Sequence, residues 1–516
     1  MNTEPVTKPK RLRLLRCPRW LGLSVVLIVT AIALFYAVEN FRGRRAWEHY
    51  RKGAEQRGLM LDFAALIPPQ ISTEQNAVDI PLVNAWFDPR MRPKGDPTLW
   101  PDLFERAQGA IGSDRDKTKR RMTDLVAWQE AFVAAEANDK KAKIRRQAHT
   151  PREVAAAATN VLVALQVYEP ALDQLREGMK RPQVRYPVDY NVETPFSILM
   201  PHLQNVRKVC SLLALRASAN LAAGNSEAAY QDVLLSLRVV DSFRNEHFLI
   251  SYLVQIACLQ TATQPLWEGM VQQRWTDPQL QAIQQQAARF DFLKGLQHAL
   301  NTESAACITT IDWIKQKKSG QRFQLLGGPD AAAGSGLGMA SFMPRGWWDM
   351  EKLSYVRMFE RSTKPLSEAI QNGTFANAED PFMEKPAHQG LSALWNHEIM
   401  SSLLLPALDK VQRKGGMGQA LADEVVVACA LERARVAEGK YPQSLTVLTP
   451  KFLPQPRRDV ITGQSLIYRT EPGGYVLYSV AWNRTDDGGA PGKVLFDEQH
   501  GDWTWRVQVE KPNEFE

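Results

Sequence analysis

The stretch that decides how this chain is built is Trp20–Val38, WLGLSVVLIVTAIALFYAV, which contains no charged residue. A helix needs roughly 20 apolar residues to cross the hydrocarbon core of a bilayer, so this stretch predicts a membrane span at residues 20–38. It is longer than the apolar core of a cleaved signal peptide, which has about 7–15 residues, and its A-x-A pattern, Ala31–Ala33, lies inside the apolar run. A buried core helix is the alternative, but the position near the N-terminus and the basic flank favour an anchor.

Basic residues on the two sides of the span are the evidence for its orientation. Each side carries six of them: Lys8, Lys10, Arg11, Arg13, Arg16 and Arg19 before it, and Arg42, Arg44, Arg45, Arg51, Lys52 and Arg57 after it. Only Glu4 opposes the first set, and a short basic tail before a first span usually stays in the cytoplasm. We therefore expect residues 1–19 to be the cytoplasmic tail of a single-pass protein of the bacterial cytoplasmic (inner) membrane, with the bulk of the chain on the periplasmic side.

The charge of the chain is concentrated at this anchor. The 516 residues contain 63 Lys and Arg against 56 Asp and Glu, a net charge of +7, and residues 1–19 hold six basic residues and one acid. The remainder is close to neutral, so we expect no nucleic-acid partner. Two basic clusters, residues 115–121 and 140–146, are predicted to be solvated helix faces. A polyanion site is the alternative, and it requires the two clusters to share a face.

Most of the ectodomain has the pattern of α-helices. The membrane-proximal region, residues 39–149, is rich in proline at first and then helical over residues 103–146. Residues 150–318 form a predicted helical domain, which opens on a capping box of Thr150 and Glu153.

A helical hairpin is predicted inside this domain. Apolar stripes over residues 206–217 and 229–240 are separated by Gly224, which should end the first helix, and by Ser226, which should cap the second. The small residues at the predicted crossing resemble one tetratricopeptide-like unit, although the pattern does not recur 34 residues further on. A generic α-hairpin is the alternative to a repeat array.

Residues 319–346 are predicted to be a flexible loop because they contain seven glycines. The segment Gly334–Gly338 suggests a phosphate-binding loop, but Met339 breaks the G-x-G-x-x-G pattern and the chain has no G-K-[ST]. Helical patterning continues over residues 347–415. The cysteines beyond the span have no C-x-x-C spacing and are expected to be buried thiols: Cys210, Cys258, Cys307 and Cys429.

The end of the chain changes in character and forms a predicted α+β module at residues 416–516. A helix from about Gln419 to Glu438 ends at Gly439, and three short strands rich in aromatic and β-branched residues follow, SLIYRT, GYVLYSV and DWTWRVQV. Gly473-Gly474 supplies a hairpin turn between the first two strands. The predicted fold class is mainly α, with helical hairpins, one N-terminal transmembrane helix and a small C-terminal module in which a long helix packs on a short antiparallel sheet.

Several motifs of this module carry a resemblance to a known family. They are Gly439–Leu445 (GKYPQSL), Pro456–Asp459 (PRRD), Tyr478-Ser479 and Asp486–Gly489 (DDGG). These segments resemble the globular domain of type II secretion major pseudopilins. The whole chain is also similar to a bacterial family of single-span proteins whose helical ectodomain ends in ALERxRxxxGxYPxSL and LYSVxWNxxDDGG. The span lacks the Glu and the cleavage site of a processed pseudopilin, so pilus assembly is not expected.

The pseudopilin resemblance implies a calcium site in the loop after the third of these segments. Calcium takes about six to eight oxygen ligands and tolerates irregular loops. The side chains that would bind it are Asn483, Asp486 and Asp487, joined by Asp497 or Asp502. The alternative is an Asp-Asp-Gly-Gly turn without metal, since Ala481 replaces the family's usual Gly and Asn483 stands where an acid is common. An EF-hand is excluded because Val494 occupies its twelfth position.

Familiar catalytic patterns are missing from the chain. It contains no G-x-S-x-G and no S-x-x-K, and Ser401 replaces the second histidine in what begins as H-E-x-x-H. The eight histidines have no ligand spacing, although His388 and His397 could converge with Glu398. Asp459 follows two arginines and is expected to form a salt bridge. Five tryptophans are predicted to lie in the core, with an aromatic binding platform as the alternative: Trp347, Trp348, Trp482, Trp503 and Trp505.

An anchor, helical hairpins and the absence of a catalytic motif favour a non-catalytic function. We predict a membrane-anchored extracytoplasmic structural or protein-interaction protein, envelope or secretion related, with the bilayer bound through residues 20–38 and a protein partner. The alternative is a hydrolase-like enzyme whose site is assembled from residues distant in sequence. A deep pocket with converging carboxylates or histidines would favour the enzyme, whereas an exposed groove or apolar patch would favour interaction.

Overall fold

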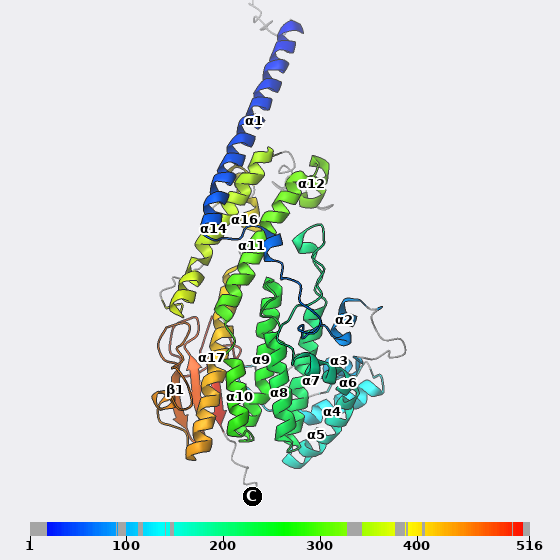
Figure 1. Cartoon of the computed structure of the whole chain (residues 1–516), viewed down its shortest axis with the longest axis vertical. Coiled ribbons are helices and arrows are strands. Elements are labelled where there is room, and N and C mark those ends of the chain that lie inside the picture. Colours follow the sequence, from blue (N-terminus) through cyan, green and yellow to red (C-terminus); the bar gives the residue numbers. More distant parts are fainter. Residues whose placement is uncertain are drawn as a thin grey trace, which may run out of the picture. The chain divides into compact units, whose positions relative to one another are not determined.

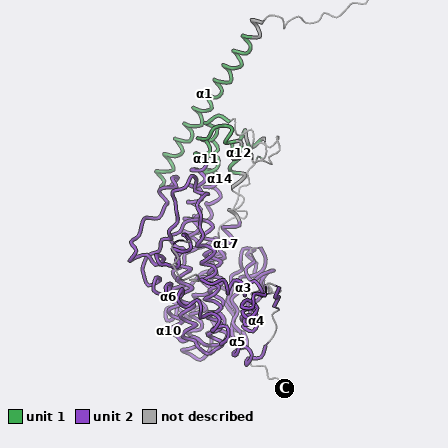
Figure 2. The backbone as a smooth tube through the Cα atoms, turned by 90° about the vertical axis from the view of Figure 1, so that its right-hand side faces the viewer, with its two compact units in different colours: residues 1–59, 311–358, 385–404 green, residues 60–310, 359–384, 405–516 purple. Residues whose placement is uncertain are grey.

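A computed structural model describes residues 18–88, 90, 100–111, 117–139, 141–144, 149–327, 343–376, 388, 391–404, 408–497 and 499–508. The chain divides into two compact units (Figure 2). Unit 1 comprises residues 1–59, 311–358 and 385–404, and unit 2 comprises residues 60–310, 359–384 and 405–516. The structure is mainly helical with a small antiparallel sheet near the C-terminus, which confirms the predicted fold class at this level. Of the predicted basic tail, only Pro18 and Arg19 lie within the described residues.

Helix α1 (Pro18–Gln56) carries the predicted span and continues well beyond it. Its apolar side chains are exposed over the first half, with Leu27 65% and Ile28 59% accessible. Among the residues that the structure describes, this is the one helix long and apolar enough to cross a membrane, with a mean hydropathy of 2.2 over its best window. After Val38 the helix becomes polar, and Glu39 is buried within unit 1.

Unit 1 has a core of its own around the middle of α1. Its further helices are the end of α11 (Phe292–Gln316), α12 (Ser319–Gly327), the start of α14 (Arg345–Asn372), α15 (Leu391–Asn396) and α16 (Ile399–Leu404). The core consists of Ile311, Ile314, Met343, Trp347, Trp348, Ala393, Ile399 and Met400. Both tryptophans predicted in this region are therefore core residues.

The prediction of a flexible loop over residues 319–346 is wrong at both ends. Residues 319–327 form α12, and α14 already begins at Arg345, while residues 328–342 lie outside the described residues. A glycine inside a helix costs only about 1 kcal/mol relative to alanine, so Gly320 does not prevent a helix whose neighbours favour one.

Unit 2 is built on a layer of helices joined by short turns. In chain order its described elements are η1 (Phe63–Leu66), α2 (Pro81–Phe87), α3 (Leu103–Ala110), α4 (Leu125–Glu136), α5 (Pro151–Leu165), η3 (Gln166–Tyr168), α6 (Glu169–Gly178), η4 (Pro195–Ser197), α7 (His202–Ala222), α8 (Ser226–Asp241), α9 (Leu249–Val271), α10 (Asp277–Ala287), the first part of α11, α17 (Leu408–Glu438) and η7 (Leu445–Leu448). Helices α7, α8 and α9 lie side by side (Figure 1). The helical pattern predicted over residues 103–146 is interrupted, because the described residues 117–124 before α4 are not helical.

Helices α7 and α8 form the predicted hairpin. Gly224 adopts a φ of +84°, a left-handed conformation that glycine accepts without strain, and the chain reverses there. The predicted cap is off by one position, since Asn225 precedes the helix and Ser226 is its first residue. The capping box of Thr150 and Glu153 is confirmed, with the Glu153 carboxylate accepting the Thr150 backbone N–H at 2.8 Å.

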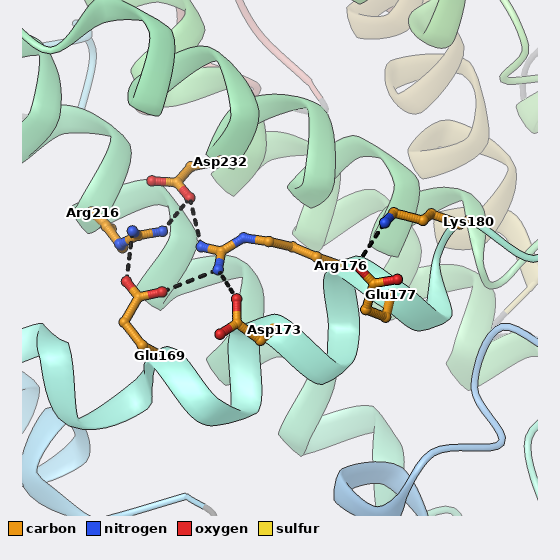
Figure 3. A network of polar contacts seen from close by, with 7 residues as sticks. All are labelled: Glu169, Asp173, Arg176, Glu177, Lys180, Arg216 and Asp232. Atoms are coloured by element: carbon orange, nitrogen blue, oxygen red, sulfur yellow. Dashed lines mark hydrogen bonds and ion pairs between the residues drawn. The ribbon is translucent and has the colours of Figure 1, made fainter.

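An ion-pair network joins α6 to this hairpin (Figure 3). Arg216 on α7 contacts Glu169 on α6 and Asp232 on α8, each at 2.6 Å, and Arg176 reaches Glu169 at 3.0 Å. Asp232 is almost fully buried, and burial raises its pKa to about 7 against the opposing effect of the arginines. Buried ion pairs hold geometry more than they add stability, so the network specifies how α6 lies on the hairpin.

The C-terminal module has the predicted helix-on-sheet arrangement. Strands β1 (Ile467–Glu471), β2 (Gly474–Ser479) and β3 (Trp503–Gln508) form an antiparallel sheet in the order β1-β2-β3, with Tyr468 opposite Leu477. Helix α17 packs on β2 and β3. It ends at Glu438, and Gly439 after it has a φ of +74°. The helix begins about ten residues earlier than predicted. Trp503 and Trp505 are fully buried and Trp482 is nearly so, which confirms their prediction as core residues.

Candidate functional site

A polar cavity of about 350 Å³ in unit 2 is the strongest candidate for a functional site. It lies at the ends of helices α8, α9 and α11, where two connecting segments, residues 242–248 and 288–291, approach each other. Its lining comprises Asp241, Phe243, Arg244, Asn245, Glu246, His247, Tyr252, Gln255, Arg289, Phe290, Asp291, Phe292, Lys294, Gly295 and His298.

Local backbone chemistry opens this cavity. Helix α8 ends at Asp241, and the Ser242 hydroxyl donates to the Val239 carbonyl at 2.6 Å, which closes the last turn. On the other wall, Asp291 accepts the Lys294 backbone N–H at 3.0 Å in the first turn of α11. Gly295 faces the Tyr252 ring, and a Cβ there would already lie 3.4 Å from it, so the absence of a side chain leaves room.

The floor of the cavity is aromatic and its polar groups are already satisfied. Phe243, Tyr252 and Phe292 are buried. The Tyr252 hydroxyl donates to the Phe292 carbonyl at 3.0 Å, and the Gln255 amide donates to the Val240 carbonyl at 3.1 Å. Burial also raises the pKa of Tyr252 well above its usual value, so the phenol stays neutral. The floor therefore offers an apolar surface to a ligand.

The rim of the cavity carries exposed cations. Asp241 pairs with Arg244 and with Arg289, the latter at 3.5 Å, and the two arginine side chains are 46% and 55% exposed. Lys294 pairs with Asp291 at 3.1 Å and is 63% exposed. Because exposed ion pairs are weak, these cations can exchange their present partners for a ligand's acidic group at little cost.

Two histidines meet at this rim, His247 from the connection between α8 and α9 and His298 from α11. The rings of His247 and His298 are stacked with centroids 5.0 Å apart and an interplanar angle of 21°. Burial, helped by the neighbouring His298, lowers the pKa of His247, while Glu246 opposes the shift. His247 is therefore a neutral imidazole at neutral pH, which can accept a proton or a hydrogen bond.

A buried histidine–carboxylate pair lies behind the cavity wall. His202 Nε2 contacts both carboxylate oxygens of Glu246 at 2.9 Å, and the His202 ring is stacked between Tyr186 and Phe87. The Ser251 hydroxyl donates to Glu246 at 2.8 Å rather than to the histidine. This differs from a nucleophilic triad, in which the serine contacts the histidine. The pair holds the Glu246 carboxylate in place and thereby fixes one wall of the cavity.

The predicted calcium ligands are engaged with the protein itself. Asn483 donates to Asp487 at 2.9 Å, and Asp486 accepts both the Tyr478 hydroxyl and the Gly488 N–H at 2.9 Å. Asp502 is buried and accepts the Gly489 N–H, and burial raises its pKa to about 6.

No three His, Cys, Asp or Glu side chains within the described ranges form a group that could hold a metal ion. A group of this kind includes neither Asn483 nor backbone carbonyls, although calcium binds both kinds of oxygen. The calcium site at Asn483, Asp486 and Asp487 therefore stays a prediction.

The other histidine group predicted from the sequence comes together only in part. In unit 1, His388 Nδ1 lies 3.1 Å from the Glu398 carboxylate, and the backbone N–H of His388 donates to the same carboxylate. His397 instead is buried against the Trp347 ring, with centroids 5.1 Å apart, and burial lowers its pKa.

The structure corrects two predictions about charged residues. Asp459 does not pair with the arginines before it, since it accepts the Ile461 N–H at 2.7 Å and the Ser479 hydroxyl at 3.0 Å, while Arg457 pairs with Asp423. Arg120, in a cluster predicted to be solvated, is half-buried, with its guanidinium carbon 4.6 Å from the Trp505 ring centre. Burial lowers the pKa of Arg120 to about 10. A backbone N–H binds Asp459 and the buried Asp423 binds Arg457, so the order of residues in the sequence does not reveal the partner of either side chain.

Comparison with protein-family models, curated proteins and solved structures finds no match for this chain. The resemblance to the pseudopilin globular domain therefore stays a prediction, carried by segments such as Gly439–Leu445.

Sequence reasoning did not find the cavity, because His247 and His298 stand far apart and neither belongs to a motif. The available signal was the pair of short connections that mix charged and aromatic residues, FRNEHF and ARFDF.

Proposed function

We propose that this chain is a membrane-anchored binding protein whose ectodomain holds a small anionic ligand with an apolar body. In this proposal residues 20–38 span the bacterial cytoplasmic membrane, the N-terminus stays inside, and the ectodomain lies on the periplasmic side. The observation that carries the ligand proposal is the cavity between α8, α9 and α11, with its aromatic floor and with exposed cations on its rim that are held by ion pairs to Asp241 and Asp291. A structural or protein-interaction role in the envelope, with a protein partner, remains part of the proposal.

The chemistry of the cavity supports this class of ligand. Pockets for small molecules commonly have volumes of about 300–1,000 Å³, and a largely apolar lining with a few polar groups fixes the ligand's orientation. Here Phe243 and Phe292 would cover the apolar body. The guanidinium groups of Arg244 and Arg289 would bind a carboxylate, because their planar donors match its two oxygens.

Benzoate is a suitable probe, with benzylammonium as the matched cation. Benzoate should raise the thermal midpoint of the full chain in detergent, since a ligand at a few times its Kd stabilises the folded state by about 1 kcal/mol. Arg289→Gln and Gly295→Leu should each abolish the rise, by removing a charge contact and by filling the cavity. Arg152→Gln, at an exposed position on α5, is the control. An equal rise with benzylammonium would contradict the anionic preference.

A hydrolase-like enzyme is the second candidate, favoured by the neutral His247 beside His298. The cavity lining includes no Ser, Thr or Cys within the described residues, so a water molecule activated by His247 would have to be the nucleophile. Hydrolysis of 4-nitrophenyl acetate that is lost in His247→Gln, while the benzoate effect persists, would establish catalysis. If the wild-type protein binds benzoate but does not hydrolyse the ester, the enzyme hypothesis is wrong and the binding-protein proposal stands.

A further inference from the structure

Trp395 is an exposed aromatic residue in unit 1 whose neighbours lead directly to the predicted span. It lies on α15 and is 66% exposed. Its ring meets that of Trp347 with centroids 5.2 Å apart, and Trp347 in turn meets Phe35 of α1 at 6.0 Å. Trp395 is therefore two ring contacts away from the last turns of the uncharged stretch.

A tight crossing of α1 and α14 fixes this arrangement. The crossing is made by Gly43 and Gly346, where an added Cβ on Gly43 would lie only 2.0 Å from the Gly346 carbonyl oxygen. The Gly346 N–H donates to the Asn40 side chain at 2.8 Å, and the Trp347 indole N–H donates to Glu39 at 2.8 Å. Because α1 is one continuous helix, the depth of the span sets the depth of these groups.

This depth corresponds to the edge of a bilayer. Phe35 stands one turn before Val38, where the uncharged stretch ends, and Glu39 follows. At this level a spanning helix passes from hydrocarbon to headgroups, which is the region that tryptophan prefers, because its ring is largely apolar and its N–H needs a polar partner. An indole left two-thirds exposed in water has no such advantage.

We propose that α15 is an interfacial helix and that Trp395 inserts into the headgroup region of the leaflet facing the ectodomain. The proposal rests on the proposed membrane span and adds a second, peripheral contact with the lipid. The occupant of this surface is a phospholipid interface, since the Trp395 ring continues the aromatic contacts that start on the span itself.

Spin labels at matched depths test the proposal in the full chain. Trp395→Cys would be labelled in a Cys17→Ser background and reconstituted in nanodiscs of phosphatidylcholine and phosphatidylglycerol. Leu27→Cys serves as the mid-span reference. Arg51→Cys serves as the aqueous reference, because it lies 16 residues beyond Phe35, roughly 24 Å along the helix.

Collisions with oxygen and with a water-soluble nickel chelate report the depth of each label. The nickel collision rate at position 395 should be at least about threefold lower than at position 51, with oxygen collisions between those of the two references, because the interface excludes the polar reagent. Asn396→Cys, also exposed on α15, should give a similar reading and guards against a local folding defect at Trp395.

The outcomes separate this inference from the proposed span. A nickel collision rate at both α15 positions equal to that at position 51 would overturn it. Shielding from both reagents would also overturn it, by indicating a second copy or a protein neighbour instead of lipid. If the label at Leu27 collides freely with nickel, the span itself fails. If only the α15 labels do so, the span stands and the interfacial helix is wrong.

Discussion

Helices α1 and α17 are both long and both contain a run of valines and other apolar residues, but the side chains of these runs lie in opposite environments. In α1, residues such as Leu27 and Val29 are more than half exposed. In α17 the valines Val425–Val427 are buried, and so are the acids Asp423 and Glu424. The difference teaches that a helix's partner, rather than its composition, decides what it can bury. A bilayer accepts apolar side chains without specific contacts, whereas a protein interior accepts carboxylates only where a cation or hydrogen-bond donors satisfy them, as Arg457 does for Asp423.

Replacing one valine by lysine in each helix should give the largest difference between the two helices. Val426→Lys places a charge in the core of unit 2, where Val426 is 2% exposed, and should lower the free energy of unfolding by more than about 4 kcal/mol. Val29→Lys should instead weaken membrane integration by about 2.5–3.5 kcal/mol, the cost of a cation at mid-span, and leave the thermal midpoint of the ectodomain unchanged. Circular dichroism in detergent and alkaline extraction of membranes measure the two effects.

Val→Leu at each position is the control for a change of shape without charge. If Val29→Lys lowers the thermal midpoint as much as Val426→Lys, the exposed face of α1 is packed against protein rather than lipid.

The pH dependence of the two helices should differ next. Burial raises the pKa of Asp423 to about 6, against the opposing effect of Arg457, so the folded state binds this proton more tightly than the unfolded chain. Stability contributed by the protonated acid is therefore complete below about pH 4 and falls as the pH rises towards 6, by about 1–3 kcal/mol. Asp423→Asn should flatten this part of the profile in denaturant titrations.

Membrane integration provides the contrast, because residues 22–38 contain no Asp, Glu, His, Lys or Arg. The fraction of chain in the membrane should stay constant over the same pH range. A profile that is equally steep in Asp423→Asn would assign the titration to other buried acids, such as Asp232 or Glu351.

The ends of the two helices should behave alike, which gives the smallest effect. Gly58 follows α1 at a φ of +79° and Gly439 follows α17 at +74°, with no atom within 4 Å of a Cβ built at either position. Gly58→Ala and Gly439→Ala should each cost about 1 kcal/mol, from backbone strain alone. Thermal midpoints of the two variants test this, and Gly→Asn at each site should cost less, since asparagine tolerates the left-handed region. A much larger effect at one site would indicate an unrecognised contact there.

Local chemistry explains which parts of the fold could be predicted. The capping box at Thr150, the left-handed glycines and the strands rich in aromatic and β-branched residues depend on neighbours in the chain, and the structure confirms them. Arg120 and Asp459 were predicted incorrectly because the Trp505 ring and the Ser479 hydroxyl, which are far from them in the sequence, come close only when the C-terminal module folds. The candidate cavity was missed for the same reason, since His247 comes from the connection before α9 and His298 from α11.

The sequence by itself determined the long apolar helix, the helical hairpin and the small sheet, because periodicity, caps and uncharged length act over a few turns of chain. Only the tertiary structure decided which acids are buried, that His247 meets His298, and that Trp395 lies near the end of the uncharged stretch. The physical reason is that burial and electrostatics depend on distances between residues, and packing brings together residues that no local pattern relates.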